Sequence, residues 1–191
     1  MKAHRRYRAR SNMRHQKGMT VVEIIIWTVA AAIVTGAFYA AFENWKKGND
    51  IETTNRIVDK IVNNAPSLRR SFGSFDGVDT TYVWGSKKLL EETNKSTTTG
   101  QIITPYSTDG LTIAAVNSAT MIDGTTLTGT NMFLSTTIKD VVDSHCQDVA
   151  EYWYPKALEV RVGTTRVASP SAISTECNRV SGKTNVVVIV N

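Results

Sequence analysis

The chain has 191 residues, with 22 lysines and arginines, 17 aspartates and glutamates, and a formal net charge of +5. Seven of the basic residues and none of the acidic ones precede residue 19, so the rest of the chain has 15 basic and 17 acidic residues, a net charge of −2. The body therefore lacks the basic surplus that is typical of nucleic-acid-binding domains, and the length suits one domain of ordinary size plus an anchor.

The first predicted elements are a basic leader and a long apolar helix. From Val21 to Phe42, the only ionisable side chains are those of Glu23 and Tyr39. These 22 residues can span a bilayer as a helix, and the positive charges upstream predict a cytoplasmic N-terminus. A charge inside such a helix costs about 2.5–3.5 kcal/mol on insertion scales, so Glu23 needs a compensating partner.

Three processing routes compete for this segment. A cleaved secretory signal has an apolar core of about 7–15 residues and a small-residue cleavage site, which residues 30–32 or 37–40 mimic, but this run is longer. A plain single-pass anchor explains the length and orientation and leaves Glu23 unexplained. Cleavage at Gly18, on the cytoplasmic side of the apolar run, accounts for both the glycine and the glutamate and is the interpretation that we favour.

The sequence Lys-Gly-Met-Thr-Val-Val-Glu at positions 17–23 resembles the processing site of type IV prepilins. The resemblance implies that prepilin peptidase cuts after Gly18 and methylates the new terminal amine of Met19. It also implies that the Glu23 carboxylate pairs with the Met19 amine of a neighbouring subunit during assembly. The alternative is that Glu23 snorkels to the membrane interface. The 18-residue leader and the mature methionine are similar to the type IVb subclass.

The apolar run continues into an amphipathic segment. Only Gly36 and Gly48 interrupt the pattern from Thr20 to Ala65, so we expect one helix of 46 residues that Pro66 ends or kinks. Within the apolar half, the Thr28 and Thr35 hydroxyls are expected to bond to carbonyls of their own helix, and Gly48 is a candidate flexible joint. The buried stripe of the second half is expected to comprise Ile51, Thr54, Ile57, Val58, Ile61, Val62 and Ala65.

The remaining residues predict an α+β head in which the long helix packs against an antiparallel sheet. Short strands or irregular segments are expected at 82–84, 101–103 and 111–116, and turns or loops at 97–100 and 124–130. Apolar residues at 3- and 4-residue spacing predict a helix over 135–152, capped by Thr136 or Thr137. Alternation predicts a strand over 157–162, and the Val/Ile-rich segment 185–190 predicts a central buried strand.

The chain contains two cysteines, Cys146 and Cys177. An even pair predicts a disulfide in an exported domain and two reduced thiols in a cytosolic protein, and the anchor favours the disulfide. Closing a loop of this size stabilises a fold by roughly 3–4 kcal/mol in the chain-entropy model. The pilin resemblance implies the same bridge, because pilins carry a disulfide around a surface-exposed C-terminal region, here residues 146–177.

These features divide the precursor into a leader (1–18), a transmembrane and assembly helix (19–45), the amphipathic half of that helix (46–66) and a head (67–191). The sequence has no nucleotide-binding loop, nucleophile elbow or paired-carboxylate motif, and its histidines share no metal-ligand spacing with acids. We therefore expect no catalytic residue, metal or cofactor. We expect the chain to be the substrate of an enzyme and not itself an enzyme.

The resemblance implies a structural subunit of a type IVb pilus in a Gram-negative bacterium. Such a subunit resides in the inner membrane before assembly. The inner-membrane assembly machinery then polymerises it with other pilin subunits into an extracellular filament. Adhesion, aggregation or conjugative contact is the expected role, and no direct nucleic-acid site is evident. The alternatives are a minor pilin, a type II secretion pseudopilin or, in another class, a monomeric signal-anchored periplasmic protein.

Overall fold

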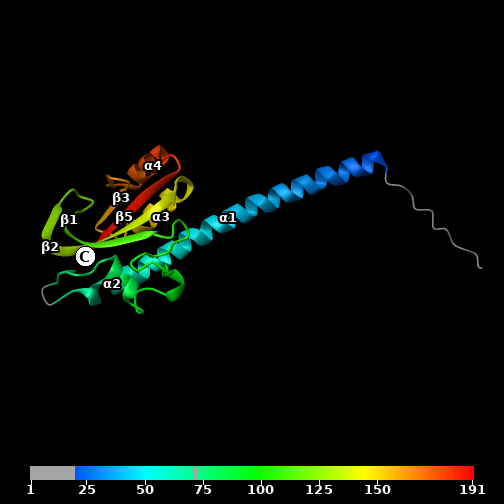
Figure 1. Ribbon diagram of the computed structural model, residues 1–191. Coiled ribbons are helices and arrows are strands. Elements are labelled where there is room, and N and C mark those ends of the chain that lie inside the picture. The colour runs from blue at the N-terminus through cyan, green and yellow to red at the C-terminus, as the bar shows by residue number, and fades with distance from the viewer. Residues whose placement is uncertain (1–19, 71–72) are drawn as a thin grey trace, which may run out of the picture. The chain divides into compact units, whose positions relative to one another are not determined.

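The computed structural model describes residues 20–70 and 73–191, which form two compact units divided between Glu43 and Asn44. Helix α1 (Val21–Leu68) contributes to both (Figure 1). The predicted continuous helix is confirmed: Gly48 lies inside it, and it ends two residues after Pro66. The predicted leader, with Gly18 and Met19, lies outside the described residues.

One antiparallel sheet organises the second unit, with strand order β1-β2-β5-β3-β4 (Figure 1). The central position of β5 confirms the prediction for segment 185–190. The α+β class, a long N-terminal helix packed on an antiparallel sheet, is confirmed as well. The elements after α1 are α2 (Thr80–Gly85), the 3-10 turn η1 (Glu92–Asn94), β1 (Leu111–Thr120), β2 (Thr126–Val142), α3 (Asp143–Trp153), β3 (Glu159–Val162), β4 (Thr165–Val167), α4 (Pro170–Arg179) and β5 (Lys183–Val190).

The main core lies between the second half of α1, the sheet and α3. The predicted α1 stripe is buried at its centre, whereas Ile51 and Val62 are half-buried at its margins. The stripe also includes Asn55, whose carbonyl oxygen accepts a 3.0 Å hydrogen bond from the indole Nε1 of the fully buried Trp153. This bond satisfies two polar groups that would otherwise be costly to bury.

A smaller apolar cluster covers the opposite face of the sheet. It contains Ala119, Phe133 and Ile189, and Ile189 faces away from the main core because successive strand residues alternate. The nearby Glu159 is buried, and its carboxylate accepts hydrogen bonds from the Thr120 backbone N–H and from Arg161 Nε, both at 2.5 Å. These contacts hold the distal end of the β1–β2 hairpin against β3.

The predicted helix over 135–152 is wrong in its first half. Residues up to Val142 belong to β2, and α3 begins at Asp143, so Thr136 and Thr137 are strand residues and not caps. The register of β2 against β5 shifts between Ile138 and Val141, where Asp140 adopts a φ of 58°. A bulge inserts one residue, so two inward-facing strand residues lie three apart and mimic helical spacing.

Two other local predictions need correction. Segment 82–84 is helical, because the Asp79 carboxylate accepts a hydrogen bond from the Tyr82 N–H at 2.7 Å and starts α2. Residues 126–130 are strand rather than loop. Segment 101–103 is irregular, in agreement with the prediction, and Ile102 forms isolated bridges with Lys95 and Leu111. Helix α4 was not predicted, although Ser169 as N-cap followed by Pro170 is a helix-start pattern.

Candidate functional site

The start of α1 is closed by a reciprocal pair of hydrogen bonds between Thr20 and Glu23. The Thr20 backbone N–H donates to Glu23 Oε2 at 2.9 Å, and the Glu23 N–H donates to Thr20 Oγ1 at 3.3 Å. The Thr20 hydroxyl also lies 3.1 Å from the same carboxylate oxygen. This is a capping box, which satisfies helix N–H groups that have no intrahelical acceptor. Glu23 therefore has a structural role within its own helix.

The apolar half of α1, Val21–Phe42, is exposed along almost its whole length in the part of the chain that the structure describes. Every residue is exposed except the half-buried Ala30. The Thr28 hydroxyl donates to Ile24 and Ile25 carbonyls and the Thr35 hydroxyl to that of Ala31, at 2.8–3.0 Å, as predicted. α1 is long and apolar enough to cross a membrane by length and composition. A helix that is apolar on all sides needs lipid or other protein around it.

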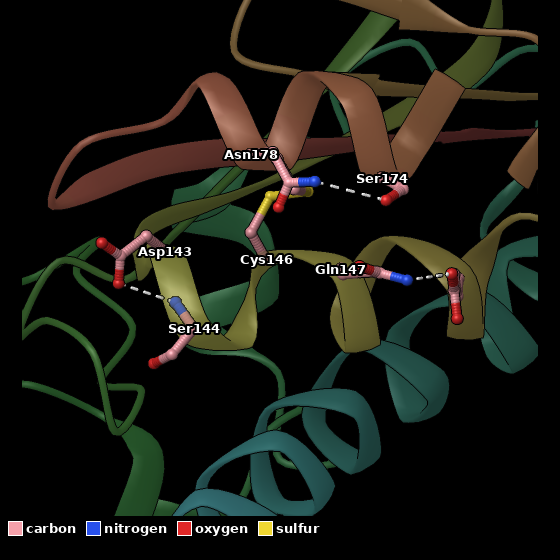
Figure 2. Close-up of a disulfide and its surroundings, with 8 residues drawn as sticks. Asp143, Ser144, Cys146, Gln147, Ser174 and Asn178 are labelled. Atoms are coloured by element: carbon pink, nitrogen blue, oxygen red, sulfur yellow. Dashed lines mark hydrogen bonds between the residues drawn. A yellow bond between two sulfur atoms is a disulfide. The ribbon is translucent and has the colours of Figure 1, made fainter. Parts of the chain in front are cut away.

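The disulfide between Cys146 and Cys177 is confirmed, with a Cα–Cα distance of 5.7 Å (Figure 2). It joins α3 to α4, and both residues are buried. Around it, Asn178 donates to Ser174 at 3.5 Å within α4. The predicted 146–177 region thus contains β3, β4 and most of both helices, and the bridge fastens its two ends together.

His145, next to Cys146, is a core residue. It is buried, and its Nδ1 lies 3.1 Å from the Tyr106 hydroxyl, with the two rings edge to face. Burial first, and then the positive charge of Lys47, hold the pKa of His145 below its ordinary value of 6.5. Burial also raises the pKa of Tyr106. In the described ranges, 20–70 and 73–191, no group of three or more His, Cys, Asp or Glu side chains could hold a metal ion.

A surface groove of about 550 Å³ lies between α1 and α3, within the second unit. Its α1 side presents Ile51 and Asn55, and its α3 side presents Tyr152, whose hydroxyl donates to Asp59 across the groove. The sequence does not predict this groove, because its two walls are about 90 residues apart along the chain. Its lining residues are Gly48, Ile51, Glu52, Asn55, Arg56, Asp59, Asp148 and Tyr152.

The capping box was also missed, although its pattern was available. Thr20-Val-Val-Glu23 before an apolar run is the [Ser/Thr]-x-x-[Asp/Glu] signature of a helix start. In comparisons with known proteins, no protein-family model and no curated protein matches the chain.

Proposed function

We propose that this chain is the precursor of a type IVb pilin, a structural subunit that polymerises from the inner membrane into an extracellular filament. The observation that carries the proposal is the placement of Glu23 in the first turn of an uncovered apolar helix, five residues after the Gly18 cleavage motif. A carboxylate at this position tolerates lipid poorly and is available to a cationic partner.

The Met19 amine is the partner that suits this carboxylate. The seven positive charges of the leader leave with it on cleavage, so they offer Glu23 no lasting partner. Cleavage after Gly18 creates a new amine, which stays cationic after a single methylation. Pairing that amine with Glu23 of an adjacent copy offsets the cost of burying either charge. The disulfide-closed α+β head supports an exported subunit, since disulfides persist outside the cytoplasm.

The N-terminus of the mature protein tests the processing step. Protein purified from membranes and from sheared cell-surface material is digested, and its N-terminal peptide is analysed by mass spectrometry. We expect a chain beginning with N-methylated Met19, and a full-length precursor when prepilin peptidase is deleted. A mature chain that begins after residue 30, or an uncleaved chain in wild-type cells, would refute the proposal.

A monomeric membrane-anchored protein is the second candidate, and the capping box favours it. Thr20 already supplies Glu23 with hydrogen bonds inside one chain, so the carboxylate has a use without any neighbour. The two candidates separate on shearing. A pilin appears in the sheared fraction as filaments visible by electron microscopy, whereas an anchored monomer stays with the membrane pellet.

A further inference from the structure

The groove between α1 and α3 carries an acidic rim over a partly apolar floor. Asp148 is paired with Lys47 at 2.8 Å, and Asp59 with Lys156 at 3.7 Å. Glu52 is exposed and has no ion-pair partner in the part of the chain that the structure describes. Three of the lining residues are acidic and one, Arg56, is basic. A cationic side chain from outside would therefore find an available carboxylate at Glu52.

Gly48 opens the end of the groove that is nearer the N-terminus. A glycine within a helix costs about 1 kcal/mol relative to alanine, and α1 has ordinary helical structure through this position. A Cβ added there would meet no atom of the described residues within 4 Å, so packing among those residues does not explain the glycine. Close approach of another molecule does, because only glycine leaves the helix backbone bare.

The chain itself presents a group of the matching chemistry directly before this groove. Trp45 is 66% exposed, and the adjacent Lys46 is exposed as well. Tryptophan is among the residues that dominate protein interfaces when they enter a pocket. The groove volume lies within the range of pockets that enclose bulky apolar groups. An indole followed by an ammonium group is complementary to an apolar floor with an unpaired carboxylate at its rim.

We propose that the groove receives Trp45 and Lys46 of a second copy of this chain, with the indole over Ile51 and Tyr152 and the ammonium at Glu52. The proposal rests on the proposed function in one respect: copies inserted in one membrane are parallel. Trp45 precedes the middle of the groove by about nine residues, or roughly 13 Å of helix. Parallel copies would thus be displaced along α1 by that distance. Such a head-to-tail contact repeats and does not close on itself.

A site-specific photo-crosslinker tests the contact directly. The full-length chain with p-benzoylphenylalanine at position 45 is mixed in equal amounts with ¹⁵N-labelled chain lacking the probe, in lipid vesicles, and irradiated. We expect mixed-isotope cross-links from position 45 to peptides containing residues 48–59 or 148–152. Cross-links to lipid alone, to other surfaces, or only within one chain would overturn the proposal.

Charge reversal provides the matched controls. Lys46→Glu and Glu52→Lys should each lower the yield of intermolecular cross-link at least fivefold, and the combined variant should restore it. Lys88→Glu makes the same charge change at an exposed lysine outside the groove and should leave the yield unchanged. Gly48→Ala should raise the melting temperature of the chain while lowering the cross-link yield. Failure of the double variant to restore the yield would exclude the Lys46–Glu52 pairing.

The outcome can be separated from that of the proposed function. If cells make filaments with an N-methylated Met19 but position 45 does not cross-link to the groove, the contact is wrong and the pilin proposal stands. If the groove cross-link forms in vesicles but cells make no filaments, the chain associates through this surface without being a pilin.

Discussion

The two halves of α1 are continuous in secondary structure and opposite in their surroundings. Val21–Phe42 has no fully buried side chain, whereas Ile57, Val58, Ile61 and Ala65 of the second half are at most 5% exposed. Both halves are helical because neither contains a residue that breaks the hydrogen-bond ladder before Pro66. The comparison shows that local sequence decides helix formation here, and that the distribution of polar residues decides what covers the helix.

The difference in covering predicts a difference in energetics. In the second half, the free energy of folding depends on side chains that fit against the sheet and α3. In the first half, it depends on backbone hydrogen bonds and on whatever apolar medium surrounds the chain. Substitutions in the first half should therefore change association between molecules, whereas substitutions in the second half should change the free energy of unfolding.

The largest effect is expected at Glu23. Glu23→Gln keeps a side chain that completes the capping box but removes the charge. If the chain is the proposed pilin, this change should lower filament yield at least about tenfold, equivalent to 1.4 kcal/mol of pairing free energy. Glu43→Ala removes the acid at the other end of the apolar run and should assemble normally. Quantifying sheared filaments measures both variants. Wild-type yield from Glu23→Gln would show that the carboxylate serves as a cap alone.

Loss of the disulfide should be among the largest changes in stability. Replacing Cys146 and Cys177 with alanine removes a loop constraint worth roughly 3–4 kcal/mol, and it affects the unit Asn44–Asn191 that contains the sheet. Near-ultraviolet circular dichroism in urea, with the chain in detergent micelles, reports the loss of tertiary packing. Helicity of Val21–Phe42 in the micelle should persist after the head has unfolded. Unchanged unfolding after complete reduction would contradict this expectation.

A matched pair of isoleucines tests the two halves against each other. Ile61 is fully buried and Ile33 is 68% exposed. Ile61→Ala should lower the free energy of unfolding by about 2–5 kcal/mol, because it removes buried methyl groups and leaves a cavity. Ile33→Ala should leave it within about 0.5 kcal/mol, as exposed substitutions do. Urea unfolding of both variants in the same micelles gives the comparison, and equal effects would contradict it.

A stabilising substitution is expected within the core. Thr136 is fully buried in β2, and its hydroxyl has no hydrogen-bond partner among the described residues. Thr136→Val should raise the free energy of unfolding by about 1 kcal/mol, because a buried polar group without a partner is penalised. The neighbouring Thr137 is half-buried, and Thr137→Val serves as the control with a smaller effect. A lower unfolding midpoint for Thr136→Val would indicate that the hydroxyl has a partner in solution.

The smallest effect is a pH dependence from His145. Its folded-state pKa lies below the unfolded value of 6.5, so the unfolded chain takes up the proton first as the pH falls. The stability contribution is therefore fully present above 6.5 and declines below it until the folded-state pKa is reached. His145→Phe should make the unfolding midpoint less dependent on pH between pH 7 and 5.5. The charged groups that act on the imidazole are Lys47, Asp50, Asp143 and Asp148, and Tyr106 contacts it.

One result would contradict the His145 prediction, and one variant serves as its control. A midpoint that rises on acidification over this range would mean that the nearby carboxylates outweigh burial and Lys47. Lys47→Gln removes the cation that lowers the pKa of His145 and should reduce the slope without abolishing it, because burial is the larger cause.

Much of this chain could be predicted because the responsible interactions are local or compositional. The unbroken helix, the uncovered apolar run, the central strand and the stripe around Ile61 all follow from the spacing of apolar residues. Cys146 and Cys177 could be paired because there were no other cysteines to choose from. The capping box at Thr20 and Glu23 was equally local, and its pattern was available in the sequence.

The tertiary structure decided the features that depend on residues far apart in the chain. The bulge at Asp140 places Ile138 and Val141 on one face of β2, and their spacing alone favoured a helix. The buried Asn55 accepts a hydrogen bond from Trp153, 98 residues later in the chain. The groove exists because α1 and α3, which are distant in the sequence, lie next to each other in the fold. Spacing along the sequence fixes which face of an element is apolar, but pairing across the fold fixes what that face meets.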